Sequence, residues 1–330
     1  MVRCLPSTAS GAAAGEITSV YATRLGTITL TWSRASLGIF LRADLRLTPS
    51  TSPSPSPDND NAVADHLRLR LRPYLTWKRK GSKLHHFTSG TGRRRVVELA
   101  WDLSLATFSR GRGPEPTGGF FVSFAVDGEI ALIVGDRREE GIYEKGSELI
   151  SRRERVRFGG LGGEMSYATK GKFEGKEMAI SISIDLEGED MRLGIDGEIA
   201  LEVTRLCWKF RGSEGVTLKS GGRIQVSWDL HDWLFRQEAG WERSPAAVGE
   251  AGEAVFVLRF ERGVEGEGQI GKGGRRAFWE GRWCFWKRDW SDSSSGSSSG
   301  SSVEELGCCE AELQSSGEGG FTLLVYGRKG

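Results

Sequence analysis

The 330-residue chain has few cysteines, no long apolar run and a net charge of only +1. The odd number of cysteines, without a Cys-x-x-Cys pair or an apolar secretory leader, does not describe a disulfide framework. We therefore expect an intracellular, cytoplasmic protein. An Ala- and Ser-rich start without an acid before Glu16 leaves organellar import open. The five cysteines are Cys4, Cys207, Cys284, Cys308 and Cys309.

Membrane insertion and global electrostatic attraction are both disfavoured. The longest aliphatic run, residues 130–134, is far shorter than the roughly 20 residues that a membrane-spanning helix needs. Lys and Arg number 45 against 44 acidic residues, so no global field steers the chain toward nucleic acid or an anionic membrane. We expect a soluble protein.

Helical periodicity is also scarce, and the dominant apolar period is two, which is typical of half-buried strands. Ile28, Leu30 and Trp32 alternate with threonines, and the leucines of residues 67–71 alternate with arginines. Isoleucines alternate with polar residues again over residues 180–184. The pattern predicts a mainly β protein with little helix.

Two motifs occur twice in the same order. Trp-Lys-Arg-Lys-Gly-Ser at 77–82 matches Trp-Lys-Phe-Arg-Gly-Ser at 208–213. Trp-Asp-Leu at 101–103 matches Trp-Asp-Leu at 228–230, each with a phenylalanine seven residues after the tryptophan. The two tryptophans of a copy are 24 residues apart in the first and 20 in the second, a difference that one hairpin loop absorbs.

We interpret the duplication as two units of six strands each, packed as a double sandwich or merged into one large barrel-like antiparallel sheet. The first unit's predicted strands are 27–32, 39–47, 66–77, 95–101, 119–126 and 129–135. The second unit's are 179–184, 191–195, 198–208, 223–228, 254–260 and 321–326.

Hairpin turns support this alignment. Asp127-Gly128 and Asp196-Gly197 predict type I′ turns, in which both central residues take positive φ. The equivalent turn of the other copy carries an insertion in each case. A shift of the apolar phase near Thr204 and Arg205 predicts a β-bulge.

These boundaries divide the chain into four parts. They are a disordered tail (1–16), a first β repeat (17–135), a connecting segment (136–178) and a second β repeat (179–330). The insertions, 48–65 and 262–320, have compositions typical of disorder and low complexity. The connecting segment contains two further possible strands, 149–155 and 165–173, and either bridges the two repeats or covers a sheet edge.

Residues 151–154, 207–212 and 226–235 resemble the plant family catalogued as domain of unknown function 868, and residues 29–32 and 77–82 fit the same pattern. The matching stretches extend from about residue 16 to 329. The resemblance implies a plant protein and supplies no catalytic or binding residues. The chain departs from the family pattern in its Pro/Ser tract and in residues 262–320.

The two Trp-Asp pairs are the natural candidates for paired carboxylate chemistry. Equivalent residues of a duplicated fold have equivalent surroundings, however, whereas an acid and a base need different surroundings. We favour a structural role, in which the tryptophans anchor the core and the carboxylates accept backbone N–H bonds at the strand ends. The alternative is a hydrolase acting on a plant carbohydrate or lipid through Asp102, Asp229 or Asp232.

Other catalytic templates are missing. His85 and His86 are adjacent, so a strand points them to opposite faces, and neither they nor His231-Asp232 have zinc-ligand spacing. No Gly-x-Ser-x-Gly motif occurs. We expect no metal and no cofactor, and a non-catalytic binding or scaffold protein. The candidate binding residues are Trp77, Lys78, Ser82, Trp101, Asp102, Trp208, Lys209, Ser213, Trp228, Asp229, His231 and Asp232.

The basic runs 78–80, 93–95 and 152–157 have acids nearby, which favours a protein partner over nucleic acid. An aromatic cluster inside the second insertion either docks on a partner or membrane surface or folds back over the β core. Its members are Trp279, Trp283, Phe285, Trp286 and Trp290.

Overall fold

The structure is a computed structural model, and all of its described residues belong to one compact unit formed by 1–261 and 316–330. Trp77, almost all of the two predicted insertions and the Trp279–Trp290 cluster lie outside the described residues. The described residues are 15–35, 38–48, 65–71, 78–88, 92, 94–108, 113–137, 146–160, 163–187, 189–218, 221–235, 252–261 and 320–330.

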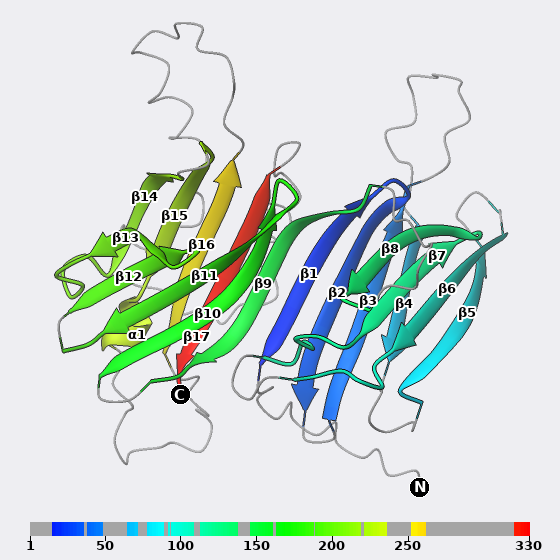
Figure 1. Cartoon of the computed structure of the whole chain (residues 1–330), viewed down its shortest axis with the longest axis horizontal. Coiled ribbons are helices and arrows are strands. Elements are labelled where there is room, and N and C mark those ends of the chain that lie inside the picture. The colour runs from blue at the N-terminus through cyan, green and yellow to red at the C-terminus, as the bar shows by residue number, and fades with distance from the viewer. Residues whose placement is uncertain are drawn as a thin grey trace, which may run out of the picture. The chain divides into compact units, whose positions relative to one another are not determined.

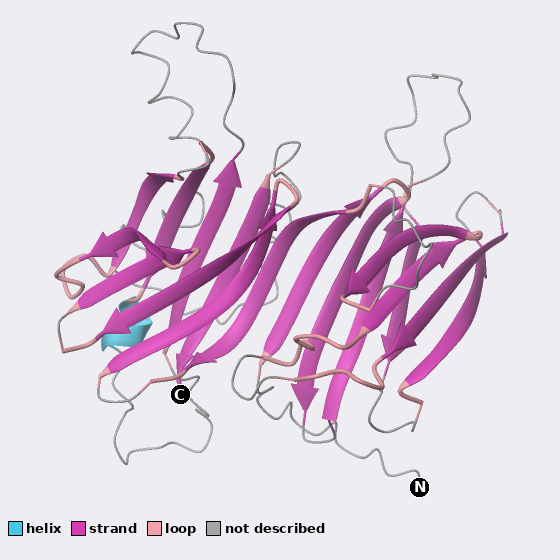
Figure 2. Cartoon of the chain, in the orientation of Figure 1, coloured by secondary structure: helices cyan, strands magenta, loops and turns pink. Residues whose placement is uncertain are grey.

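The described chain forms seventeen strands and one short helix (Figures 1 and 2). The first eight strands are β1 (Glu16–Thr23), β2 (Gly26–Ala35), β3 (Gly38–Leu47), β4 (Asp65–Leu71), β5 (Lys80–Thr88), β6 (Arg94–Asp102), β7 (Phe121–Val126) and β8 (Glu129–Gly135). After β9 (Glu148–Phe158) follow β10 (Glu164–Phe173), β11 (Lys176–Asp185), β12 (Asp190–Ile195), β13 (Glu198–Val203), β14 (Arg211–Thr217), β15 (Arg223–Asp229), α1 (His231–Phe235), β16 (Glu253–Glu261) and β17 (Phe321–Lys329). The prediction of a mainly β fold with little helix is confirmed.

The strands form three open sheets. The largest has the order β14-β15-β16-β17-β9-β1-β2-β3-β4, and the other two are the meanders β5-β6-β7-β8 and β10-β11-β12-β13. Every described pairing is antiparallel except that of β9 with β17. Because no described sheet closes on itself, the alternative of one barrel-like sheet is wrong.

The prediction of six strands per repeat is not confirmed, because eight strands precede β9 and eight follow it. The extra strands are β1 and β5 in the first half and β10 and β14 in the second. β5 and β14 are edge strands with mostly exposed or half-buried residues, so they lack the apolar alternation by which strands are recognised. β1 begins at Glu16, inside the predicted tail, and one of its fully buried positions is a serine, Ser19.

Local turn chemistry was predicted correctly at two places and incorrectly at a third. Asp127-Gly128 and Asp196-Gly197 take positive φ at both residues, 53° and 85° in the first and 51° and 84° in the second. The prediction of a β-bulge at Thr204 and Arg205 is wrong: β13 ends at Val203, and the apolar phase shifts because Arg205 takes a φ of 58° in a turn.

The large sheet and each small sheet enclose a separate apolar core. Trp32, fully buried on β2, belongs to the core under β5–β8. Ile17 lies opposite Trp32 and also opposite Glu154 of β9, so these three side chains share one face of the large sheet. Val156 and Phe158, two and four residues after Glu154, belong to the core under β10–β13. Both small sheets therefore cover the same face of the nine-stranded sheet, as Figure 1 shows.

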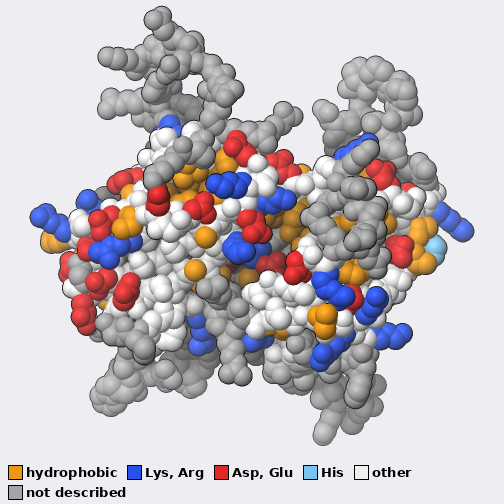
Figure 3. Space-filling model, in the orientation of Figure 1, with side chains coloured by type: hydrophobic (Ala, Val, Ile, Leu, Met, Phe, Trp, Pro, Cys, Tyr) orange, Lys and Arg blue, Asp and Glu red, His pale blue; other side chains and the backbone are white. Residues whose placement is uncertain are grey.

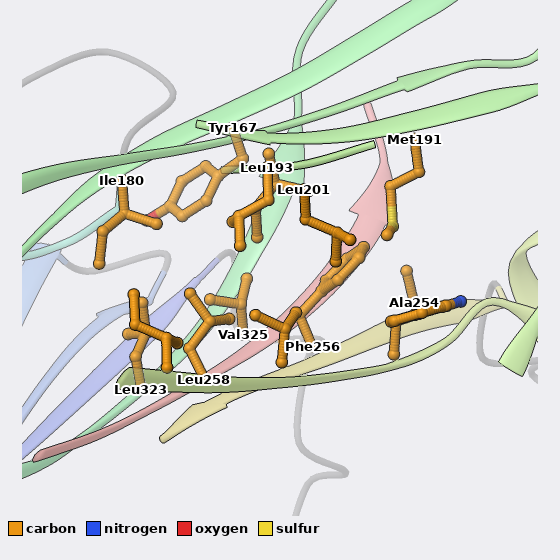
Figure 4. Packing of buried hydrophobic residues seen from close by; sticks show 14 of the residues in the cluster. Tyr167, Ile180, Met191, Leu193, Leu201, Ala254, Phe256, Leu258, Leu323 and Val325 are labelled. Atoms are coloured by element: carbon orange, nitrogen blue, oxygen red, sulfur yellow. The ribbon is translucent and has the colours of Figure 1, made fainter. Parts of the chain in front are cut away.

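The second core illustrates how alternation builds the sandwich. Tyr167, Ile180, Leu193 and others from the small sheet face Phe256, Leu258, Leu323 and Val325 from the large one (Figure 4). The Phe158 ring packs between other aromatic rings: its centroid lies 5.3 Å from that of the Trp233 ring and 6.0 Å from that of the Phe256 ring. Each alternating strand contributes its apolar residues to this layer and its polar residues to the outside.

A buried polar network crosses the boundary between the two cores on β9. Glu154 is fully buried and Arg152 is mostly buried, and the Arg152 Nε donates to Glu154 Oε1 at 2.5 Å. The same guanidinium donates to Ser19 Oγ of β1 at 3.1 Å and to the carboxylate of Glu115, both in the first half. Arg152 thus ties β9 to the first sandwich.

Glu154 makes the corresponding contacts to the second sandwich. It accepts hydrogen bonds from the Tyr167 hydroxyl at 2.9 Å and from Thr169 Oγ1 at 2.7 Å, both on β10. A buried carboxylate is tolerated because it is paired with a guanidinium and accepts further hydrogen bonds. The connecting segment therefore bridges the halves through β9, and its second predicted strand, β10, belongs to the second small sheet.

Replacing Glu154 with glutamine should remove one of the two carboxylates that pair with the mostly buried guanidinium of Arg152, leaving Glu115 as its remaining acidic partner. The expected loss in the free energy of unfolding is about 1.5 to 3 kcal/mol, because a buried hydrogen-bonded ion pair is weakened, measured by denaturant titration. The matched control is Glu202→Gln, which removes an exposed carboxylate paired with Arg192 at 2.8 Å and should have no measurable effect. Equal losses in the two variants would contradict the assignment.

Burial and the neighbouring charge of Glu154 raise the pKa of Tyr167 well above its ordinary value. The unfolded chain loses this proton above a pH of about 10, whereas the folded chain retains it. Stability should therefore fall as the pH rises beyond that point. In Tyr167→Phe the alkaline fall should be shallower than in the wild type, as measured by denaturant titrations between neutral and alkaline pH. Parallel curves for the two proteins would exclude Tyr167 as the source.

Candidate functional site: the two Trp-Asp turns

The two repeated motifs of each half come together in one local structure. In the first, Gly81 of β5 lies directly opposite Trp101 of β6. The Trp101 indole N–H donates to the Lys78 carbonyl at 3.1 Å, and the Leu103 N–H donates to the Arg79 carbonyl at 2.7 Å. We call residues 78–82 with 101–104 the first Trp-Asp turn.

The second half repeats these bonds. Gly212 of β14 lies opposite Trp228 of β15, whose indole N–H donates to the Lys209 carbonyl at 2.8 Å. The Leu230 N–H donates to the Phe210 carbonyl at 2.8 Å. Residues 209–213 with 228–231 form the second Trp-Asp turn, and its tryptophan is buried like that of the first.

Asp102 and Asp229 stabilise the two turns by accepting backbone hydrogen bonds. Asp102 Oδ1 accepts the Ser104 backbone N–H at 2.9 Å, and Asp229 Oδ1 accepts the His231 backbone N–H at the same distance. Each carboxylate also pairs with a cation across the strand pair: Asp229 with Arg211 Nε at 3.0 Å, and Asp102 with Lys80 Nζ at 3.8 Å. These contacts match the structural role proposed from the sequence, and neither arrangement resembles a carboxylate poised for acid–base chemistry.

Asp102 is the more deeply buried of the two, at 3% exposure. Burial is the largest influence and raises the pKa of its carboxyl. Hydrogen bonds from the Ser104 hydroxyl and backbone, together with the charges of Arg137 and Lys80, outweigh burial and leave the pKa below its ordinary value. The group is therefore held ionised as an acceptor, which suits a turn cap.

The exposed surroundings of the two turns differ. At the first, the positions that match Phe210 and His231 are Arg79 and Ser104, and Phe108 packs partly buried against the first core. At the second, Phe210, His231 and Phe235 form a ring cluster with centroids 5.3 to 5.6 Å apart. Phe235 is 47% exposed. Trp208, two residues before Phe210, is 84% exposed, the highest value among the large apolar residues described.

The remaining predicted residues occupy ordinary surface positions. Ser213 Oγ lies 2.8 Å from Ser227 Oγ and accepts a hydrogen bond from Gln225, whereas Ser82 is exposed on edge strand β5. The His231 Nδ1 lies 3.0 Å from Asp232 Oδ1, and both side chains are about half exposed. Within the described ranges, no group of three or more His, Cys, Asp or Glu side chains has the geometry to hold a metal ion.

Sequence reasoning missed the aromatic cluster of Phe210, His231 and Phe235, although it selected His231. The available signal was the phenylalanine at the same spacing after each Trp-Asp pair. It also missed the buried pair on β9, because Glu154 stands among arginines in a run that is typical of a solvated strand face. Only the pairing of β9 between β1 and β17 explains why this carboxylate is buried.

Comparison with known proteins gives a family and no activity. The profile of the family described as "Plant protein of unknown function (DUF868)" matches residues 12–329. No curated protein matches the chain, and no solved structure does. Within the described ranges, the structure contains no helix with the length and apolar character to cross a membrane.

The paired glycines allow a matched test of the Trp-Asp turns. A Cβ at Gly212 would lie under 3.0 Å from three atoms of the Trp228 ring, whereas at Gly81 the nearest Trp101 atom would be 3.1 Å away. Gly212→Ala should therefore cost about 1 to 3 kcal/mol of unfolding free energy through overpacking, and Gly81→Ala should cost less. Denaturant titration of both variants checks the order, and the reverse order would contradict the proposed glycine–tryptophan packing.

Proposed function

We propose that this chain, which belongs to the plant family DUF868, is a non-catalytic binding or scaffold protein that binds a protein partner through the aromatic cluster beside its second Trp-Asp turn. The binding surface consists of Trp208, Phe210, His231 and Phe235. The exposure of Trp208 carries the proposal. A tryptophan that is 84% exposed contributes little packing energy to its own fold, and tryptophan is among the residues most enriched at interaction hot spots.

The contrast between the two turns supports the same conclusion. Both use the same glycine–tryptophan packing, the same indole hydrogen bond and the same aspartate cap. They differ at two matched surface positions, where the first has Arg79 and Ser104 and the second has Phe210 and His231; Trp208 itself matches Trp77 in sequence. Phe210 packs partly against the second core, whereas Trp208 and Phe235 are exposed, so the outer part of the cluster is available for recognition.

The chemistry of the cluster favours a protein partner. The rings supply apolar area, while Lys209 and Asp232 stand beside them with opposite charges. Such a mixture of rigid aromatic surface and a polar rim is typical of protein interfaces. Asp102 and Asp229 are occupied with backbone N–H groups and cations, and Asp232 Oδ1 lies 3.0 Å from His231 Nδ1, so each of the three carboxylates of the hydrolase alternative already has a partner.

An affinity capture from plant extract with the full chain tests the proposal. Trp208→Ala should remove most of the recovery of at least one protein that the wild type retains reproducibly, by roughly tenfold or more, since hot-spot aromatic residues contribute at least 2 kcal/mol. Its folding should be unchanged because the side chain is exposed. The measurement is quantitative mass spectrometry of the captured proteins.

Ile199→Ala is the matched control, because Ile199 is another large apolar residue, 66% exposed, on edge strand β13. It should leave the recovery of that same protein unaltered. If Trp208→Ala and Phe235→Ala both retain every protein that the wild type captures, the aromatic cluster is not the binding surface.

A further inference from the structure

The nine-stranded sheet has a second face, turned away from both small sheets, with an unusual set of charges. Alternation assigns to it every second residue of each strand, among them Arg153, Arg155 and Arg157 of β9. Following the paired residues from each strand to its neighbour assigns eleven arginines, six acids and no lysine to this face. We call it the arginine face. Its excess of five positive charges stands against a net charge of +1 for the whole chain.

Three of the acids are matched locally. Asp44 pairs with Arg42 and Arg68, Asp229 with Arg211, and Glu253 with Arg328. These pairs account for part of the face and stabilise the cross-strand neighbours.

Four exposed arginines remain without an ion pair to any described residue: Arg46, Arg70, Arg155 and Arg157. Arg70 lies directly opposite Arg42, a like-charge cross-strand pair that is unfavourable in isolation. Arg155 stands over the Tyr326 ring at 5.2 Å, which holds its guanidinium against the sheet. None of these four guanidinium groups forms an ion pair within the described part of the chain, although Glu16 lies directly opposite Arg155 on β1.

The composition of the face indicates which kind of anion it suits. Arginine without lysine is typical of protein interfaces, where guanidinium groups bind carboxylates in a bidentate manner. Tyr326 and Val257, both half-buried, add apolar area between the charges. The six interspersed acids would repel a continuous row of phosphates but suit a protein surface with charges of both signs.

The spacing of the arginines along β9 also fits an acidic protein partner. Arg155 and Arg157 are two residues apart on one strand, a separation of about 7 Å. Acidic side chains at alternate positions of an extended peptide have that same separation. By contrast, the face seen in Figure 3, which the two small sheets cover, displays cations and acids intermingled.

We propose that the arginine face binds an acidic protein surface, separately from the aromatic cluster at Trp208. Charge complementarity selects the partner, and the four unpaired arginines provide most of the attraction. The binding should weaken as salt is added, because exposed charges are screened.

The test measures binding of the full chain to poly-L-glutamate at low ionic strength, with single-stranded poly(U) RNA and phosphatidylserine vesicles as competing polyanions. The wild type should bind poly-L-glutamate, and more tightly than either competitor. A variant carrying Arg46→Gln, Arg70→Gln, Arg155→Gln and Arg157→Gln should bind poly-L-glutamate roughly tenfold or more weakly.

The control removes the same charge from the two small sheets. Its substitutions are Lys83→Gln, Arg94→Gln, Lys172→Gln and Lys176→Gln, all at exposed strand positions. This variant should bind poly-L-glutamate nearly as tightly as the wild type. The proposal is overturned if the wild type does not bind poly-L-glutamate, if it prefers RNA or vesicles, or if the control loses as much affinity as the test variant. Trp208→Ala should leave this binding unchanged, which separates the result from that of the aromatic cluster.

Discussion

The buried pair of Arg152 and Glu154 is the contact on which the two-sandwich arrangement depends. β9 enters the large sheet between β1 and β17, and the two side chains project at the boundary of the two cores. An apolar pair at these two positions would fill the space but would not require specific neighbouring side chains. A guanidinium and a carboxylate out of water must find partners, and they find them in opposite halves: Ser19 and Glu115 in one, Tyr167 and Thr169 in the other.

With the two halves connected by the Arg152–Glu154 pair on β9, the remaining strands follow a regular order. Each half is a pair of four-stranded meanders, with β9 added to the sheet that the halves share. Because both small sheets cover one face of the shared sheet, its other face is left with the polar side of nine alternating strands. The arginine face is thus a consequence of the topology as much as of the sequence.

Function is best sought where the two halves stop resembling each other. The indole and backbone hydrogen bonds of the two Trp-Asp turns correspond, so the turns explain how the chain folds twice in the same way. The exposed residues beside them correspond only in part: Phe210 and His231 stand where the first turn has Arg79 and Ser104, whereas Trp208 matches Trp77 in sequence. A binding function resting on such a difference requires no catalytic group.

The sequence by itself determined the β class, the two Asp-Gly turns and the backbone role of Asp102 and Asp229, because all of these follow from short-range alternation and turn chemistry. It did not reveal β5 and β14, since edge strands bury too little to show a pattern. Tertiary structure alone decided that Glu154 is buried, that Trp208 is exposed and that eleven arginines share a face. Each of these depends on which strand lies beside which, and strand pairing over more than a hundred residues leaves no local trace in the sequence.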